Sequence, residues 1–391
     1  MCVTRILIAI RRVLNHKFLF AMTNYKNNND INLVLVHLFL LLIFSSVIEA
    51  AFWTQLHENT EDGAPEPVRG EFTANAWNGG IYVYGGCDIN FENWLNDTWV
   101  FPVEDVAEKG NEDSVRAYKL DTFGEAPPGT CGHGAVVIGD RLYVYGGNGP
   151  DGETSALHFL DLRENRWTEV PRSQDQVWPP SRALVQHSLT ISGSNTFILV
   201  SGISGDVYDD DSAYEFSVVD NTWTKVSEGM AGHKQVGGSA AVTINNRLYV
   251  MGGYENRSVI DDLYFLDIGQ DKSFKAVVFD DDASPGPLSF QGALSLGEYL
   301  IVYGGFSMEA INGDVWVFKG NRDGDDGGWC QLRTSSTKPL PHFAGGWVAV
   351  GESLYAFGGR INPTGFHEKL TSDLWRLDDF EASIQHSCGF S

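Results

Sequence analysis

Three histidines and two arginines occur at similar positions in the repeated units of this 391-residue chain. Side chains of these types can bind anions or metal ions. When the units are aligned on a shared Gly-Gly pair, one level holds Phe72, His133, His187, Ser239, Gln291 and Gly345. The level just before it holds Arg69, Arg182, Gln235, Phe290 and His342. Arginine offers a planar fork of donors to an anion. We therefore predict a shared binding site for an anionic or sugar-like ligand, with the polar members Arg69, His133, Arg182, His187, Gln235, Gln291 and His342.

Two other interpretations of these side chains stay open. Each could bond a neighbouring unit and be structural, or the three histidines could converge on a metal, although they come from separate units. No nucleophile is indicated, because the chain lacks a Gly-x-Ser-x-Gly motif. The carboxylates gather in predicted turns, where water keeps their pKa ordinary. We accordingly assign no catalytic residue, no metal and no cofactor.

The elements that must position these residues are six copies of a short apolar strand that ends in glycine. The copies are Ile81–Gly86, Arg141–Gly147, Phe197–Gly202, Arg247–Gly253, Tyr299–Gly305 and Ser353–Gly359. Their closing glycines are 51 to 61 residues apart. Units of this size bury their apolar faces only by stacking on copies of themselves. The third copy has Ser201 in place of the first glycine, which makes its turn the least regular.

A second strand follows each glycine pair and begins with Asp in five of the six units, at Asp97, Asp211, Asp262, Asp314 and Asp373. An aromatic residue on a fourth strand comes next, at Tyr118, Trp167, Trp223, Phe274 and Trp329. The paired glycines and spaced aromatics resemble the kelch repeat. The resemblance implies an all-β fold, a six-bladed propeller with the first strands around a central channel. Some proteins that share this fold are copper oxidases or sugar epimerases, but fold alone does not transfer chemistry.

The strand that opens the exported part of the chain is predicted to close the ring. Ala51–Leu56 resembles a fourth strand whose first three strands are missing, with Trp53 at the aromatic position. The sixth unit ends after three strands. Pairing the two pieces in one blade leaves no free sheet edge.

The first 50 residues are predicted to direct export. Residues 31–48 carry no charged side chain and follow a basic segment, which is typical of a secretory signal cut before Ala51. Translation from Met22 would give a signal of ordinary length, and retention as an uncleaved signal anchor is the alternative. The predicted organisation is a leader at 1–50, a propeller at 51–380 and a tail at 381–391. The product is expected to be secreted, or tethered to the membrane and facing outward.

The charge excludes some partners. The chain has a net charge of −24, and without residues 1–50 the body has 22 basic and 49 acidic residues, a net of −27. Such a body repels nucleic acid and anionic membranes. Asn321, Asp323 and Asp325 alternate as calcium ligands would, but the loop lacks the Gly and the distal Glu of a calcium motif. We read it as an acidic turn.

Four cysteines remain after the leader. In an exported chain they predict disulfides. Neighbouring loops favour Cys87–Cys131 at the seam of the first two blades and Cys330–Cys388 between the last two, with four free thiols as the alternative. Asn96 and Asn256 head glycosylation sequons in exposed loops.

These observations favour a monomeric binding module that recognises a protein or glycan through its loops. The alternative is a carbohydrate-active enzyme, similar to a mutarotase, epimerase or oxidase, at the channel mouth. An enzyme requires Arg69, Arg182, His133 and a carboxylate to converge on one wet pocket, whereas a binding module leaves them bonded to neighbouring blades. An intracellular adaptor is disfavoured by the leader.

Overall fold

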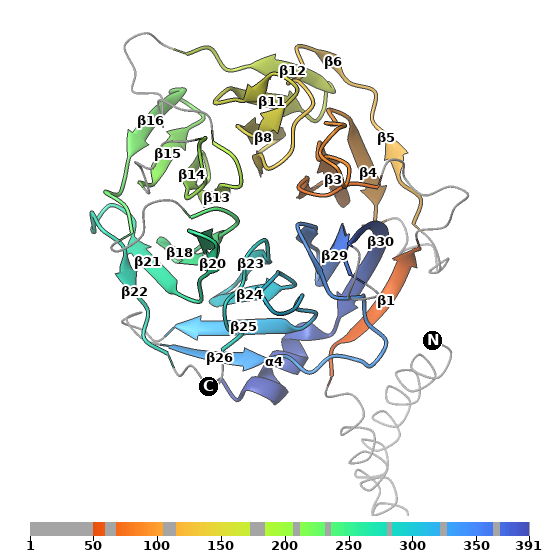
Figure 1. Ribbon diagram of the computed structural model, residues 1–391, viewed down its shortest axis with the longest axis vertical. Helices are drawn as coiled ribbons and strands as arrows, with labels where there is room; N and C mark the ends of the chain where they lie inside the picture. Colours follow the sequence, from red (N-terminus) through yellow and green to blue (C-terminus); the bar gives the residue numbers. More distant parts are fainter. Residues whose placement is uncertain are drawn as a thin grey trace, which may run out of the picture.

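The apolar run of each repeat becomes the second strand of a four-stranded antiparallel sheet, because its residues are buried from both sides. Six such sheets are arranged in a ring in the computed structural model (Figure 1). The structure describes residues 50–58, 68–104, 115–172, 184–205, 212–230, 236–279, 284–320, 327–362 and 368–390. The predicted six-bladed propeller is confirmed.

The first three blades follow in sequence order. Blade one consists of β2 (Thr73–Trp77), β3 (Gly80–Tyr84), β4 (Thr98–Pro102) and β5 (Tyr118–Lys119). Blade two consists of β7 (Gly134–Ile138), β8 (Arg141–Tyr145), β11 (Leu157–Asp161) and β12 (Arg166–Glu169), with β6 (Phe123–Gly124) added parallel to β12. Blade three consists of β13 (Ser188–Gly193), β14 (Thr196–Val200), β15 (Tyr214–Ser217) and β16 (Thr222–Lys225).

The other three blades complete the circle. Blade four consists of β17 (Ala240–Ile244), β18 (Arg247–Met251), β21 (Leu263–Asp267) and β22 (Lys275–Ala276). Blade five consists of β23 (Gly292–Leu296), β24 (Tyr299–Tyr303), β25 (Val315–Gly320) and β26 (Gly327–Gln331). Blade six consists of β28 (Gly346–Val350), β29 (Ser353–Ile361), β30 (Lys369–Asp378) and β1 (Phe52–His57), with the short β27 (His342–Phe343) against the end of β29.

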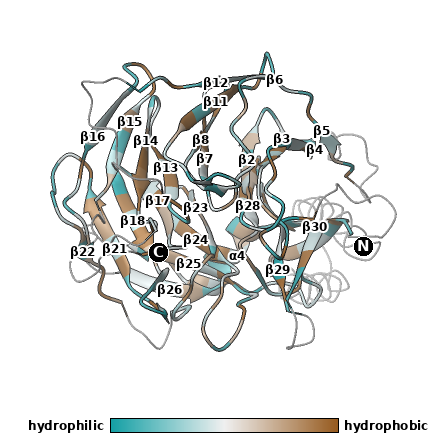
Figure 2. Ribbon diagram, turned by 45° about the horizontal axis from the view of Figure 1, so that its top comes forward, coloured by the Kyte–Doolittle hydropathy of each residue, from teal (hydrophilic) through white to brown (hydrophobic). Residues whose placement is uncertain are grey.

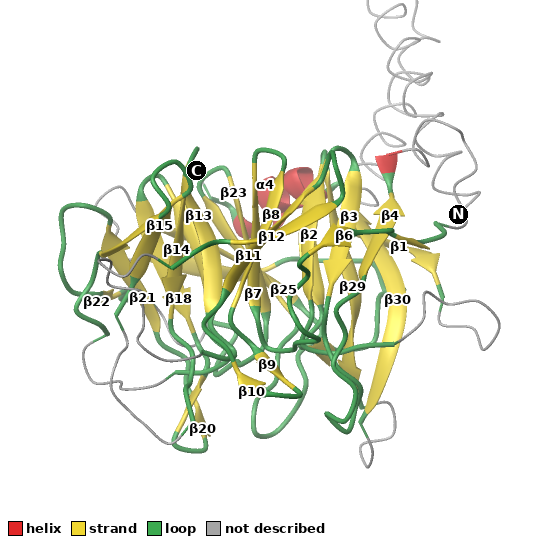
Figure 3. Cartoon of the chain, turned by 90° about the horizontal axis from the view of Figure 1, so that it is seen from above, coloured by secondary structure: helices red, strands yellow, loops and turns green. Residues whose placement is uncertain are grey.

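Two small hairpins extend from one face of the ring. They are β9 (Asn148–Gly149) with β10 (Gly152–Glu153), and β19 (Tyr254–Glu255) with β20 (Ser258–Val259). Figure 3 shows β9, β10 and β20 on the face opposite α4 (Phe380–Cys388). The loops that join second to third strands are on the hairpin face, which we call the loop face.

The N-terminal strand closes the ring as predicted. β1 pairs antiparallel with β30, with Trp53 opposite Leu377, and Figure 1 shows the two strands side by side. Trp53 is 5% exposed, and its ring centre lies 5.2 Å from that of Tyr303 and 6.1 Å from that of Trp347. The first strand therefore completes blade six and also packs against blade five.

A second closure runs through the backbone around the channel. One residue per blade donates its N–H to the carbonyl of the equivalent residue in the preceding blade, and the six hydrogen bonds, 2.7 to 3.1 Å long, form a closed cycle. All six residues have positive φ, between 52° and 64°. We call them the ring residues: Glu71, Gly132, Gln186, Gly238, Phe290 and Ala344.

Large and small side chains alternate around this cycle. Blades one, three and five carry Glu71, Gln186 and Phe290, whereas the intervening blades carry Gly or Ala. A Cβ added at Gly132 would lie 3.3 Å from Oε2 of Glu71, and one at Gly238 would lie 3.2 Å from the ring of Phe290. The small residues therefore make room for the three large side chains.

The glycine pairs connect each blade to the next. The second glycine donates its N–H to the following blade at five of the six seams, for example from Gly86 to Thr130 O at 2.8 Å. Its φ is near +100° in every blade, and at Gly86 a Cβ would meet the Gly70 carbonyl at 2.8 Å. Ser201, the one departure from the pair, keeps the turn with a φ of 63°.

The hydrophobic core is divided among the seams between blades. One cluster joins Tyr143 and Tyr145 of blade two to Phe197 and Phe216 of blade three. Figure 2 shows hydrophobic residues concentrated on the strands inside the blades. Each blade is therefore stabilised chiefly by its two neighbours, as the repeat length predicted.

The C-terminal tail contains a helix that the sequence did not predict. Helix α4 buries Phe380 and Ile384, and Oγ of Ser383 accepts a hydrogen bond from Ala51 N at 3.1 Å. Cys388, at its end, forms a disulfide with Cys330, with Cα atoms 5.4 Å apart. The tail thus fastens blade five to the start of β1. No helix in the described ranges is long and apolar enough to cross a membrane.

We predict that Trp53→Ala lowers the free energy of unfolding by about 3 to 5 kcal/mol, because it removes a buried aromatic side chain from the closing seam. Urea unfolding followed by tryptophan fluorescence and circular dichroism measures this change. Phe123, which is 61% exposed, provides the control. Phe123→Ala should change stability by less than about 0.5 kcal/mol. Equal midpoints for Trp53→Ala and the wild type would show that β1 does not hold the ring closed.

Candidate functional site

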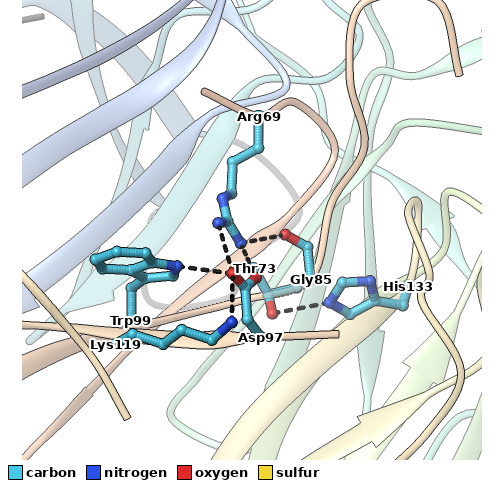
Figure 4. Close-up of polar contacts among 7 residues, drawn as sticks. All are labelled: Arg69, Thr73, Gly85, Asp97, Trp99, Lys119 and His133. Carbon is cyan, nitrogen blue, oxygen red and sulfur yellow. Dashed lines mark hydrogen bonds and ion pairs between the residues drawn. The ribbon is translucent and has the colours of Figure 1, made fainter. Parts of the chain in front are cut away.

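Arg69, a predicted ligand-binding residue, is used inside blade one. Its guanidinium donates to Oδ1 of Asp97 at 2.8 Å and to the carbonyl of Gly85 at 2.9 Å, and the side chain is 3% exposed. Figure 4 shows that Asp97 also accepts a hydrogen bond from the indole N–H of Trp99 and forms an ion pair with Lys119. Burial alone would raise the pKa of Asp97, but the bond and charge of Arg69 outweigh burial and hold that pKa below its usual value. Arg69 therefore fixes the turn after β3.

The predicted histidines are also seam residues. Nε2 of His133 lies 3.1 Å from Oγ1 of Thr73 in the preceding blade (Figure 4). Nε2 of His187 accepts the backbone N–H of Gly134 at 3.1 Å. In blade five Gln291 bonds the preceding blade in place of a histidine, because its side-chain amide donates to the carbonyl of Met251 at 2.9 Å.

A tyrosine from the preceding blade meets each histidine edge-on. The ring centres of Tyr84 and His133 are 5.2 Å apart, those of Tyr145 and His187 are 5.4 Å apart, and those of Tyr303 and His342 are 5.0 Å apart. His342 thus occupies the same seam place as the other two histidines, although it comes three residues earlier in its unit. The three imidazoles belong to three different seams, and only His133 and His187 line a common cavity.

Burial keeps these imidazoles neutral. Desolvation lowers the pKa of His133 to about 4, and desolvation together with the charge of the nearby His133 lowers the pKa of His187 to about 3. The pKa of His342 is also lowered by burial, against a hydrogen bond to the Leu340 carbonyl. A neutral seam imidazole suits packing and backbone bonding rather than binding of an anion.

The structure brings one predicted level together in one cavity, which Phe290 of the other level also lines. Phe72, His133, His187, Ser239, Gln291 and Gly345 all line a cavity of about 160 Å³ in the channel. Arg69 and His342 do not line it, and Arg182 and Gln235 lie outside the described residues. The convergence of Arg69 and His133 that an enzyme requires is absent from the described part of the chain, so nothing supports the enzyme alternative.

The ring residues line the same cavity, together with the predicted level. Burial raises the pKa of Glu71, although Arg360 and a hydrogen bond from Gln186 oppose that shift. Oε1 of Gln186 in turn accepts the hydroxyl of Tyr254 at 3.2 Å. This chain of bonds links blades one, three and four across the channel. Of the ring residues, alignment on the glycine pair selected only Phe290, although the glycines at 132 and 238 indicated a positive φ there.

Four half-buried aromatic rings continue from the opening toward blade six. Tyr254 stacks on Phe290 with centres 6.0 Å apart, Phe290 lies 6.2 Å from Phe343, and Phe343 lies 5.5 Å from Phe306. We call these four residues the aromatic track. One half of the opening is therefore aromatic, whereas the other half carries Glu71 and Gln186.

The predicted Cys87–Cys131 disulfide is wrong for this structure. The two residues are neighbours, as the seam argument required, but both are buried free thiols. The pKa of Cys87 is raised by its hydrogen bond with Cys131 and by burial. Each cysteine is also held by a two-bond bridge, Cys87 to Gly70 and Cys131 to Asn148, which fixes its backbone.

Other predicted sites have simple placements. Asn96 and Asn256 are exposed, and Asn256 lies in the turn between β19 and β20. The acidic loop with Asn321, Asp323 and Asp325 lies outside the described residues. Within the described ranges, no group of three His, Cys, Asp or Glu side chains could hold a metal ion.

We predict that the neutral seam histidines make the propeller sensitive to acid. Their folded-state pKa values lie below the unfolded value, so the unfolded chain binds more protons and stability falls as pH drops from about 6.5 toward 3. For His133 the difference between the unfolded and folded pKa values corresponds to a loss of roughly 3 kcal/mol in the free energy of unfolding below pH 4. His133→Gln/His187→Gln, which copies Gln291, should flatten this dependence. Urea unfolding at pH 7, 5.5 and 4.5 tests it, and parallel curves for variant and wild type would contradict it.

Comparison with known proteins agrees with this architecture. A family profile described as the KLHDC2/KLHL20/DRC7 Kelch-repeats domain matches residues 37–202 and 186–382. Acyl-CoA-binding domain-containing protein 4 of Arabidopsis thaliana is 28% identical over 286 residues, which are 70% of this chain and 41% of that protein. Kelch domain-containing protein 10 of Homo sapiens is 26% identical over 196 residues, 48% of this chain and 41% of that protein. The chain thus spans about two fifths of these relatives. With six repeats, a closed ring and a profile match over most of its length, the chain belongs to the kelch-repeat family.

Proposed function

We propose that this kelch propeller is an exported protein-binding module that holds its partner on the loop face, over the channel opening. The observation that carries the proposal is the aromatic track, four half-buried rings on a surface otherwise made of turns. Aromatic side chains are enriched where proteins bind one another, since they bury large areas with few rotatable bonds. Kelch propellers generally bind proteins.

Strain at the opening supports the same surface. A non-glycine residue at positive φ costs about 1 to 2 kcal/mol, and Gly132 and Gly238 show that the ring does not need a side chain at every position. Phe290 nevertheless has a φ of 56° and presents its ring beside Tyr254. A large aromatic residue in a strained position is expected where its side chain has a use.

Export is part of the proposal and is supported by separate features. The apolar leader resembles a signal, the Cys330–Cys388 disulfide suits an oxidising compartment, and the sequon residues Asn96 and Asn256 are exposed. Glycans at these positions would extend from the loop side of blades one and four. The partner would then dock mainly over blades five and six, where the aromatic track ends.

We predict that Phe290→Ala/Phe343→Ala reduces partner capture at least about tenfold, because central aromatic residues contribute most of the binding energy at interfaces. The full chain is expressed in mammalian cells, collected from the medium, and used to capture proteins from medium and cell-surface extracts with quantitative mass spectrometry. Ala344 shows that alanine fits the ring position, so the variant should fold. Phe123→Ala, on the outer edge of blade two, is the matched control.

Two results would overturn parts of this proposal. Equal capture by the wild type and the double variant would exclude the aromatic track as the binding surface, and sharp binding to one sugar class on a glycan array would favour a lectin. Retention of the full chain inside the cell without glycans would exclude export.

A further inference from the structure

A groove opens between blades five and six on the loop face. It has a volume of about 530 Å³, within the range of ligand-binding sites, and its apolar wall consists of Phe306, Met308, Ile311, Leu340 and Pro341. Met308 is 66% exposed and Leu340 is 53% exposed. Large apolar side chains exposed together mark interaction surfaces. Methionine in particular adapts to the shape of a partner.

The groove continues the aromatic track. Phe306 lines the groove and also contacts Phe343, with ring centres 5.5 Å apart, so the groove and the channel opening form one surface. A chain segment that starts over Phe290 can therefore follow the track outward into the groove without crossing a polar gap.

A hydrogen-bonded turn presents one side of the groove. Ser307 N donates to the carbonyl of Ala310 at 2.8 Å, and Oγ of Ser307 accepts the N–H of Ala310 at 3.0 Å. These bonds hold Met308 and Glu309 at the tip of the turn. A turn ordered before binding lowers the entropy cost of association.

The charge of the groove is acidic. Its two charged lining residues within the described ranges are Glu309 and Glu368. Glu368 lies 3.4 Å from the guanidinium of Arg360, whereas Glu309 makes no ion pair with any described residue. The chain beyond residue 50 has a net charge of −27. A cationic side chain would therefore be attracted to the groove and bind beside Glu309.

A polar side chain also lines the groove. Asn362 belongs to its wall, and Oδ1 of Asn362 is buried without a hydrogen-bond partner among the described residues. A polar amide beside an apolar wall suits an extended polypeptide, which has backbone donors and acceptors, better than a purely apolar molecule.

We propose that the groove binds an extended segment of a protein partner in which a large apolar residue is flanked by lysine or arginine. The apolar side chain packs against Met308, Ile311 and Leu340, and the cation lies beside Glu309. This inference rests on the proposed protein-binding function and names the chemistry of the partner.

A random dodecapeptide phage library panned on the full chain tests this proposal. The enriched peptides should carry Leu, Ile, Met, Phe or Trp next to Lys or Arg. The affinity of these peptides for the Met308→Asp/Leu340→Asp variant, measured by fluorescence anisotropy, should be at least about tenfold lower than for the wild type. Glu309→Lys should weaken binding and reduce its dependence on salt. Val219→Asp, at an equally exposed apolar residue in blade three, and Glu352→Lys, in a turn of blade six, should leave the affinity unchanged.

The outcomes separate this proposal from the proposed function. Enriched peptides without basic residues, or peptides unaffected by Met308→Asp/Leu340→Asp, overturn the groove proposal. If binding of the enriched peptides is lost only in Phe290→Ala/Phe343→Ala, the groove proposal is overturned, whereas the proposed binding at the channel opening is supported. If panning enriches no peptide but the capture experiment yields a folded partner, the proposal of a linear segment is excluded and the proposed protein-binding function stands. Failure of both the selection and the capture excludes both proposals.

Discussion

The closed cycle of six backbone hydrogen bonds around the channel is the constraint on which the rest of the structure depends. Each bond needs one residue per blade with positive φ, and four of these residues are not glycine. Their strain, about 1 to 2 kcal/mol each, is comparable to the net gain from a hydrogen bond, about 0.5 to 1.5 kcal/mol. The cycle therefore adds little net stability by itself, and the apolar seams stabilise the ring. The cycle instead links every blade to its two neighbours around the channel.

This constraint also determines which side chains meet at the channel. In blades two, three and five the residue after the ring residue is a histidine or glutamine that bonds the preceding blade. The ring residues line the same cavity, and steric crowding permits a large side chain only in alternate blades. Glu71, Gln186 and Phe290 occupy those three places. The aromatic track extends from Phe290 toward the blade five and six groove.

The repeat pattern was sufficient to predict the fold but not the opening. Regular spacing of the glycine pairs predicted six blades, and the isolated Trp53 strand predicted closure, because an unpaired edge must find a partner. Alignment on the glycine pair selected His133, His187 and Gln291, which bond neighbouring blades at the seams, and a ligand-binding role for this set stays a prediction. His342 also reaches its seam from three residues earlier, which no alignment of units would show. Helix α4 was not predicted, because a segment of nine residues shows little helical periodicity. The proximity of Cys87 and Cys131 could be predicted, but their bonding could not, since adjacency alone does not decide whether two thiols are oxidised.

Hydrogen exchange at the six ring amides tests the central claim most directly. The backbone N–H groups of Glu71, Gly132, Gln186, Gly238, Phe290 and Ala344 should all exchange slowly and with one common free energy, equal to that of global unfolding, because opening any one bond breaks the cycle. Exchange measured by NMR at several low urea concentrations provides the six values. Rapid exchange at Glu71, whose N–H joins the first blade to the last, with protection at the other five amides would show an open array of blades and contradict the closed ring.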